Sequence, residues 1–277
     1  MPCMPVLFVS HGSPMLALDA EWGPGEWSKV LRVWGSGFSP KAIVAISAHW
    51  EGDGDGVIRV TASPQPGILH DFGGFPPELY RLEYPAPGDP ALGERLVVRL
   101  REAGLASESD AQRALDHGVW VPLRAAFPAA QVPVVQISLP RPRTPATLVR
   151  LGRALAPLRD EGVLLMASGG LVHNLALLDW EHPDPQVAGQ AGPPAWAQAF
   201  EVWMRTAVED GDLEALIAAP RLAPSFHMAV PTTEHLDPLY VAIGAAGNDS
   251  PAMLFEGWQH GSLSLRAWVW GDSGKNP

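Results

Sequence analysis

Five of the nine histidines stand where predicted strands end or predicted helices begin. His11 and His49 each follow a short apolar run by one residue. Imidazole nitrogen is a ligand for zinc, iron, copper and nickel. Closed structural zinc sites mostly use clustered cysteines, whereas this chain has one cysteine, Cys3, and its histidines are far apart. Such spacing favours a catalytic metal site that the fold assembles. The other three histidines are His117, His173 and His235.

The segments before His11 and His49 predict how the two side chains meet. Residues 5–10 and 41–48 are continuous apolar runs, which is typical of strands buried on both faces of a parallel sheet. Ligands of open α/β folds bind at the carboxyl edge of the sheet. Two imidazoles delivered to that edge could share one ion.

The remaining pattern alternates strands with helices and predicts an α/β sandwich with a mostly parallel central sheet. No linker or shift in composition divides the chain, so we expect a single domain over residues 1–277. His173 follows a predicted strand, and His117 and His235 precede predicted helices. Further strands are expected at 56–62, 132–139, 162–168, 253–256 and 262–270, and helices at 22–34, 90–103, 119–127, 145–159, 193–208, 212–219 and 237–246.

Other catalytic motifs are missing from the sequence. Ser168 is followed by two glycines, but no G-x-S-x-G sequence that would place a serine nucleophile on a sharp turn occurs. The HExxH pattern of zinc proteases is also absent. The pairs Gly73-Gly74 and Gly169-Gly170 fit no phosphate-binding pattern and are interpreted as turns.

Charge and composition exclude several classes of partner. The net charge is −11, and lysines and arginines do not cluster, which argues against nucleic-acid binding. No apolar stretch reaches membrane-spanning length and the N-terminus lacks a signal-peptide pattern, so we expect a soluble, cytoplasmic protein. The 11 tryptophans either line a pocket for a flat aromatic substrate or pack in the core. The oligomeric state is left open.

A set of short segments runs in order along almost the whole chain: HGSPM at 11–15, SAHW at 47–50, HDFGGFP at 70–76, YPAPG at 84–88, DHG at 116–118, ASG at 167–169, HNL at 173–175, EH at 234–235 and GSLS at 261–264. Together they resemble the 4,5-DOPA extradiol dioxygenase family, the DODA branch of the class III (LigB-type) extradiol dioxygenases. The resemblance implies a LigB-type α/β fold and one divalent metal ion. That ion is Fe(II) for dioxygenase activity, and Zn(II) is often found in members as isolated.

The resemblance also implies roles for individual histidines. His11, His49 and His235 match the metal-binding histidines of the family. His173 matches a histidine at or beside the metal, and His117 matches the acid/base histidine of class III enzymes. The broader class commonly uses two histidines and one carboxylate, so Glu234 remains an alternative to His235 as third ligand. An all-histidine site is less anionic, which raises the chance of zinc occupancy.

The implied reaction opens the ring of a catechol with O₂, next to the two hydroxyl-bearing carbons. His117 or His173 is expected to take the catechol proton and later return it. Asp116 either fixes a histidine tautomer or caps a helix. The loop around His70 is expected to cover the pocket, with Phe72, Phe75 and Trp50 either stacking on the substrate ring or packing in the core. His182, His227 and His260 are interpreted as structural or surface residues.

Two other functions fit the same residues. A zinc-dependent hydrolase would use an open histidine site to activate water. A binding protein without catalysis is the other alternative, since the Memo family is similar in fold and is associated with protein interaction. Retention of all five histidines argues against a binding protein, which has no need of them.

Overall fold

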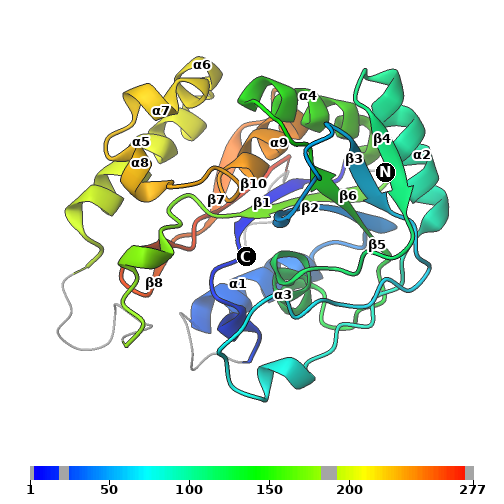
Figure 1. The fold of residues 1–277 in the computed structure, drawn as a ribbon, viewed down its shortest axis with the longest axis horizontal. Coiled ribbons are helices and arrows are strands. Elements are labelled where there is room, and N and C mark those ends of the chain that lie inside the picture. Colours follow the sequence, from blue (N-terminus) through cyan, green and yellow to red (C-terminus); the bar gives the residue numbers. More distant parts are fainter. Residues whose placement is uncertain (1–2, 19–24, 182–191, 272–277) are drawn as a thin grey trace.

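The structure is a computed structural model that describes residues 3–18, 25–181 and 192–271. Its centre is an eight-stranded sheet with the order β4-β3-β5-β2-β6-β1-β10-β7 (Figure 1). The four inner strands are parallel, as the apolar runs predict. They are β1 (Val6–Ser10), β2 (Ala42–Glu51), β5 (Val134–Leu139) and β6 (Val163–Gly169).

Antiparallel pairs extend the sheet on both sides. On one side β3 (Ile58–Thr61) pairs antiparallel with β5 and parallel with β4 (Ser107–Asp110). On the other side β10 (Ala267–Trp270) lies antiparallel to both β1 and β7 (Pro251–Phe255). The prediction of a mostly parallel α/β sheet is confirmed. Strand β4 was not predicted, because its sequence SESD has no apolar pattern.

Helices cover both faces of the sheet (Figure 1). Side chains of β1 alternate between them: Val6 and Phe8 enter one core, and Leu7 and Val9 enter the other. The first core is covered by α2 (Pro90–Glu102), α4 (Pro145–Leu155) and α9 (Asp237–Ala246), with α5 (Ala195–Glu209), α6 (Leu213–Ile217), α7 (Ala219–Leu222) and α8 (Phe226–Ala229) adding to it. The second is covered by α1 (Gly25–Ser36) and α3 (His117–Ala126).

The helices begin where local signals predict. Asp89 accepts the backbone N–H of Leu92 at 2.9 Å and caps α2, whose first residue is Pro90. The predicted helix 145–159 becomes the short 3₁₀ turn η3 (Ala156–Arg159) after Leu155. The other 3₁₀ turns are η1 (Pro14–Ala17), η2 (Leu79–Arg81) and η4 (Leu175–Leu177). No helix of the described residues is long and apolar enough to cross a membrane.

Two boundaries differ from the sequence prediction. Strand β2 extends to Glu51, so His49 lies within the last three residues of the strand and not beyond its end. The β2–β5 register is irregular between Ile46 and Glu51, which lets the strand continue past its apolar run. The predicted strand 262–270 is divided: β9 (Leu263–Ser264) pairs with β8 (Trp258–Gln259), and β10 joins the main sheet.

Candidate metal centre

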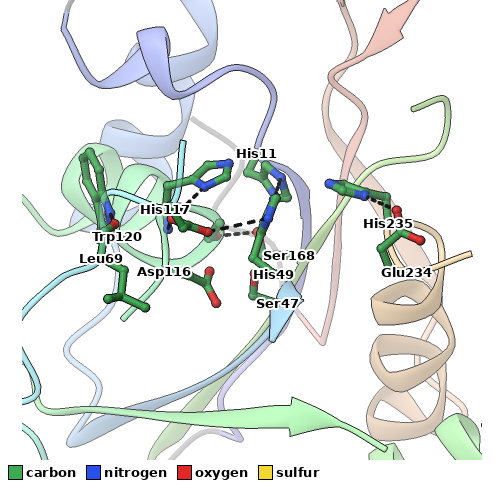
Figure 2. A network of polar contacts seen from close by, with 12 residues as sticks. His11, Ser47, His49, Leu69, Asp116, His117, Trp120, Ser168, Glu234 and His235 are labelled. Carbon is green, nitrogen blue, oxygen red and sulfur yellow. Dashed lines mark hydrogen bonds and ion pairs between the residues drawn. The ribbon is translucent and has the colours of Figure 1, made fainter. Parts of the chain in front are cut away.

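All five predicted site histidines lie at the carboxyl edge of the parallel strands, around one pocket of about 590 Å³. His11 directly follows β1 and His49 lies near the end of β2. His173 is in the loop after β6, His117 is the first residue of α3, and His235 lies two residues before α9. Figure 2 shows His235 facing His11 and His49 from the α9 side of the pocket.

His11, His49 and His235 present ring nitrogens to one another. Their candidate ligand atoms lie within 4.8 Å of one another, and the Nε2 atoms of His11 and His49 are 3.0 Å apart. Two nitrogens that each bind an ion at about 2.1 Å lie about 3.0–3.4 Å apart for angles between about 90° and 109°. The spacing of His11 and His49 therefore fits two ligands of one cation.

The outer nitrogens of these rings have partners that set the tautomers. His11 Nδ1 lies 2.9 Å from the Ser168 hydroxyl, which itself donates to the carbonyl of Gly118. The serine oxygen must therefore accept the hydrogen of Nδ1. His235 Nδ1 lies 3.0 Å from a carboxylate oxygen of Glu234. His235 Nε2 is buried and has no hydrogen-bond partner among the described residues. Both rings are thus arranged to present an unprotonated Nε2.

Burial keeps these imidazoles neutral. Desolvation, followed by the neighbouring histidines, lowers the pKa of His11 and His235 well below the usual range. The same causes lower the pKa of His49 to about 3. A neutral imidazole keeps one N–H. With the hydrogen of His11 on Nδ1 and that of His49 on Nδ1 toward Asp71, the two Nε2 atoms face each other across 3.0 Å as two acceptors. A divalent cation between them removes the repulsion of their lone pairs, so the residues fit a bound metal.

Asp71 lies between His117 and His49 and contacts both. One of its carboxylate oxygens accepts both the backbone N–H and the Nδ1–H of His117, each at 3.0 Å. The other lies 3.6 Å from His49 Nδ1. Burial opposes ionisation of this carboxyl, but its hydrogen bonds with the ring and the backbone of His117 lower the pKa of Asp71 to about 2. Asp71 is therefore an ionised carboxylate that orients His117.

His173 lies beside the three facing nitrogens. Its ring stacks on that of His235 with centroids 3.3 Å apart and planes 8° from parallel. Its ligand atom groups with those of Glu234 and His235 and not with those of His11 and His49. Burial lowers the pKa of His173 to about 4, against the opposing effect of Glu234. His173 thus supports the His235 side of the pocket.

Arg143 links the two chain segments that carry His49 and His235. Its guanidinium donates to Glu51, two residues after His49, and to Asp237, two residues after His235, with both contacts at 2.5 Å. An arginine whose side chain is only 10% exposed and contacts two carboxylates is a rigid connection. The sequence analysis missed this role, because no spacing relates Arg143 to either acid.

A close backbone approach positions His235. A Cβ atom on Gly169 would lie 2.1 Å from the carbonyl oxygen of His235, and the N–H of Gly170 donates to that oxygen at 2.8 Å. Only glycine at the end of β6 lets the His235 loop lie against the strand.

We therefore expect Gly169→Ala to displace the His235 loop. The clash is with backbone, so unfolding free energy should fall by about 1–3 kcal/mol, and the affinity for a divalent metal should fall with it. Gly170→Ala is the matched control, because no atom of the described residues lies within 4 Å of a Cβ built there. Thermal unfolding and metal titration of both variants measure this; equal behaviour of the two would contradict it.

The pocket walls correct several sequence interpretations. Phe72 and Phe75 line the pocket, whereas Trp50 is buried against Arg113, 5.1 Å from its ring, away from the described lining. His260, interpreted as structural or surface, lines the pocket. Exposed His227 lies on α8, and His182 lies outside the described residues.

The loop around His70 contributes residues 71–75 to the pocket lining, as expected, whereas His70 itself lies outside that lining. Its ring packs beside Phe72 and Trp120, with centroids 5.7 and 5.8 Å away. Asp116 differs from both of its expected roles. Asp116 accepts from the Gln136 amide at 2.5 Å, and its side chain neither caps α3 nor contacts a ring histidine among the described hydrogen bonds. Burial raises its pKa. The carboxylates beside histidines are Asp71 and Glu234.

The chain is similar to known proteins along most of its length. Residues 5–266 match the family model described as the catalytic LigB subunit of aromatic ring-opening dioxygenase. The chain is 39% identical over 262 residues to a 4,5-DOPA dioxygenase extradiol of Beta vulgaris, covering 93% of this chain and 92% of the relative. It is 38% identical over 268 residues to the protein of that name from Escherichia coli K12, covering 95% and 93%.

A solved structure shows the same fold. The crystal structure of an uncharacterized protein from Escherichia coli K12 superposes with a TM-score of 0.76 at 34% identity, covering 96% of this chain and 99% of that one. The family model and the relatives each span most of the chain. The chain therefore belongs to the family of catalytic LigB subunits of aromatic ring-opening dioxygenases and is an oxidoreductase related to extradiol dioxygenases.

Proposed function

We propose that this chain, as one catalytic domain, opens the ring of a catechol with O₂ at a single divalent metal held by His11, His49 and His235. The observation that carries the proposal is the convergence of three neutral imidazoles in a pocket of about 590 Å³. The pocket has room for a flat aromatic ring beside these nitrogens. The family supplies the reaction class.

The choice of His235 over Glu234 rests on their contacts. Glu234 contacts His235 at Nδ1, whereas His235 groups with His11 and His49 and its Nε2 is buried without a partner among the described residues. Carboxylates in this position fix the orientation of a metal-binding histidine. A divalent ion held there, Fe(II) in the reaction or Zn(II) in isolated protein, supplies a Lewis acid for the catechol oxygens and, as iron, an electron path between ring and O₂.

His117 serves as the acid/base group in this proposal. Asp71 holds the hydrogen on Nδ1, so Nε2 is left as the acceptor for the proton of a catechol hydroxyl. The ring centroid of His117 lies 4.0 Å from that of His49, which places this acceptor beside the metal-binding side of the pocket. The negative charge of Asp71 stabilises the imidazolium that proton uptake forms.

His173 holds the opposite side of the pocket in the same scheme. Stacked on His235, it fixes the plane of that ring and lines the space in which the substrate lies. Phe72 and Phe75 on the covering loop supply aromatic surface to the substrate ring and exclude water. As a second candidate for proton transfer, His173 would act from the side opposite His117.

Oxygen uptake tests the proposal. Protein loaded with Fe(II) under anaerobic conditions should consume O₂ in equal amount to the catechol converted and form a yellow ring-opened semialdehyde. The panel contains DOPA, protocatechuate, caffeate and simple catechols. Absence of turnover with all of them contradicts ring cleavage. Ester or amide cleavage by the Zn(II)-loaded protein without O₂ uptake would indicate a hydrolase instead.

A further inference from the structure

The main chain of His49 lies where the regular pairing of β2 ends. The pairing of β2 with β6 ends at Ser47, which lies opposite Ser168. The pairing of β2 with β5 is irregular between Ile46 and Glu51. His49 therefore lies in a stretch of strand that has no regular ladder with its neighbours. Backbone N–H and C=O groups inside a protein need hydrogen-bond partners, so such a stretch must find some of them among side chains.

Side chains contact both main-chain groups of His49. The Ser47 hydroxyl accepts the N–H of His49 at 3.1 Å. Arg113, 64 residues further along the chain, donates from Nη2 to the carbonyl oxygen of His49 at 3.0 Å. A hydrogen bond from a charged donor is shorter and stronger than one between neutral groups. Arg113 thus anchors the backbone of the histidine whose Nε2 faces that of His11.

Two further contacts fix the guanidinium of Arg113. It lies over the ring of Trp50, 5.1 Å from the centroid, and its Nη2 is 3.5 Å from a carboxyl oxygen of Asp116. The Arg113 side chain is 23% exposed, and that of Asp116 is fully buried. A planar guanidinium can stack on an aromatic ring and donate in its own plane at the same time. One side chain therefore connects the end of β2 with the residue that precedes His117 and α3.

The backbone of Arg113 is itself held by a turn. Asp110, the last residue of β4, accepts the N–H groups of Gln112 and Arg113 at 2.8 and 2.9 Å. Aspartate commonly forms such turns with the backbone that follows it. Because β4 pairs with β3 in the main sheet, Arg113 extends from a fixed point of the fold. Its guanidinium is placed by the sheet and not by an unsupported loop.

We infer that Arg113 is a positioning residue of the metal centre, which holds the main chain of His49 and connects it to the start of α3. The inference rests on the proposed function in one respect, that His49 is a metal ligand. Arg113 lies outside the described lining of the pocket, so it acts through His49 and not on the substrate. Partners that orient metal-binding histidines contribute about 10- to 100-fold to metal affinity.

Arg113→Met tests this role, because it keeps an apolar stem beside Trp50 and removes the donors. Affinity for Zn(II), measured by competition with a chromogenic chelator, should fall at least about ten-fold. Arg113→Lys restores a charged donor but not the planar group that makes all three contacts, so its affinity should fall by about three-fold. Arg101→Met is the matched control. Arg101 also donates to a backbone carbonyl, that of Ser107, but lies outside the pocket lining, and Zn(II) affinity should stay unchanged.

A spectroscopic readout separates positioning from general stability. Co(II) bound in place of Zn(II) gives visible absorption that depends on the geometry of the ligands. At full Co(II) loading, the spectrum should change in Arg113→Met, return toward the wild-type spectrum in Arg113→Lys and stay unchanged in Arg101→Met. Urea unfolding of the metal-free proteins should show that Arg113→Met and Arg101→Met are both destabilised. Only the substitution at Arg113 should then alter the metal centre.

Wild-type Zn(II) affinity and a wild-type Co(II) spectrum in Arg113→Met would overturn the positioning role. If that variant does not fold, the same two results in Arg113→Lys would overturn it. A loss of affinity in Arg101→Met equal to that in Arg113→Met would also do so, because the effect would then be one of stability. Loss of affinity confined to Arg113, in a protein whose Fe(II)-loaded wild type opens no catechol, would support the positioning role and contradict the proposed reaction alone.

Discussion

Replacing His49 with alanine is expected to abolish metal retention and, with it, ring cleavage. The substitution removes one of two nitrogens that face each other across 3.0 Å and leaves a gap on the β2 side of the site. Loss of a partner that only orients a ligand already costs about 10- to 100-fold in metal affinity, so loss of the ligand should cost at least about 100-fold. Metal content after gel filtration and equilibrium dialysis measure the effect.

The control for this prediction is a histidine remote from the pocket. His227→Ala removes an exposed imidazole on α8 and should leave metal content and activity unchanged. His11→Ala should behave as His49→Ala does. A His49→Ala protein that keeps one equivalent of metal with unchanged affinity would remove His49 from the ligand set.

Replacing His117 with glutamine is expected to separate metal binding from catalysis. The amide can still contact Asp71 but has no nitrogen that takes up a proton near neutral pH. General acid/base catalysis contributes about 100- to 10,000-fold, so kcat should fall by that amount while metal content is retained. Steady-state O₂ uptake, normalised to bound iron, measures this drop.

Asp71→Asn provides the graded comparison for His117→Gln. An amide can accept from His117 but carries no charge to stabilise the imidazolium, so kcat should fall less than in His117→Gln. If His117→Gln retained full activity per bound iron, proton transfer would have to be assigned elsewhere, with His173 as the remaining candidate lining the pocket.

Much of the fold could be predicted from the sequence because its inner strands are buried on both faces. Continuous apolar runs before His11 and around β5 and β6 have no other stable placement in a chain of this composition. The edge strand β4 and the pair β8–β9 were harder, since two- to four-residue strands with polar or mixed sequences carry no periodic signal.

The candidate ligands were predictable for a related reason. Histidines at the carboxyl ends of parallel strands meet at one edge, so His11, His49 and the loop histidines could be grouped before any geometry was known. The side chains that orient these histidines could not be predicted from the sequence. Ser168 is part of a buried strand, and Asp71 lies in a long loop between β3 and α2, where no period relates it to His117.

His260 was the least predictable residue of the pocket lining. His260 is distant in sequence from every other pocket histidine except His235, and no spacing distinguishes it from a surface residue. A helix-like or strand-like pattern does not encode a left-handed backbone at a non-glycine residue. For Trp50, core packing is the alternative that the structure shows: it follows His49 directly, and adjacent residues of a strand point to opposite faces.

The central claim is that one cation sits among three imidazoles. Anomalous diffraction from crystals of the Fe(II)- or Zn(II)-loaded protein tests it most directly. A single peak within bonding distance, about 2.0–2.2 Å, of nitrogens from His11, His49 and His235 is the predicted result. A peak bound elsewhere, or coordination by Glu234 with His235 turned away, would contradict it.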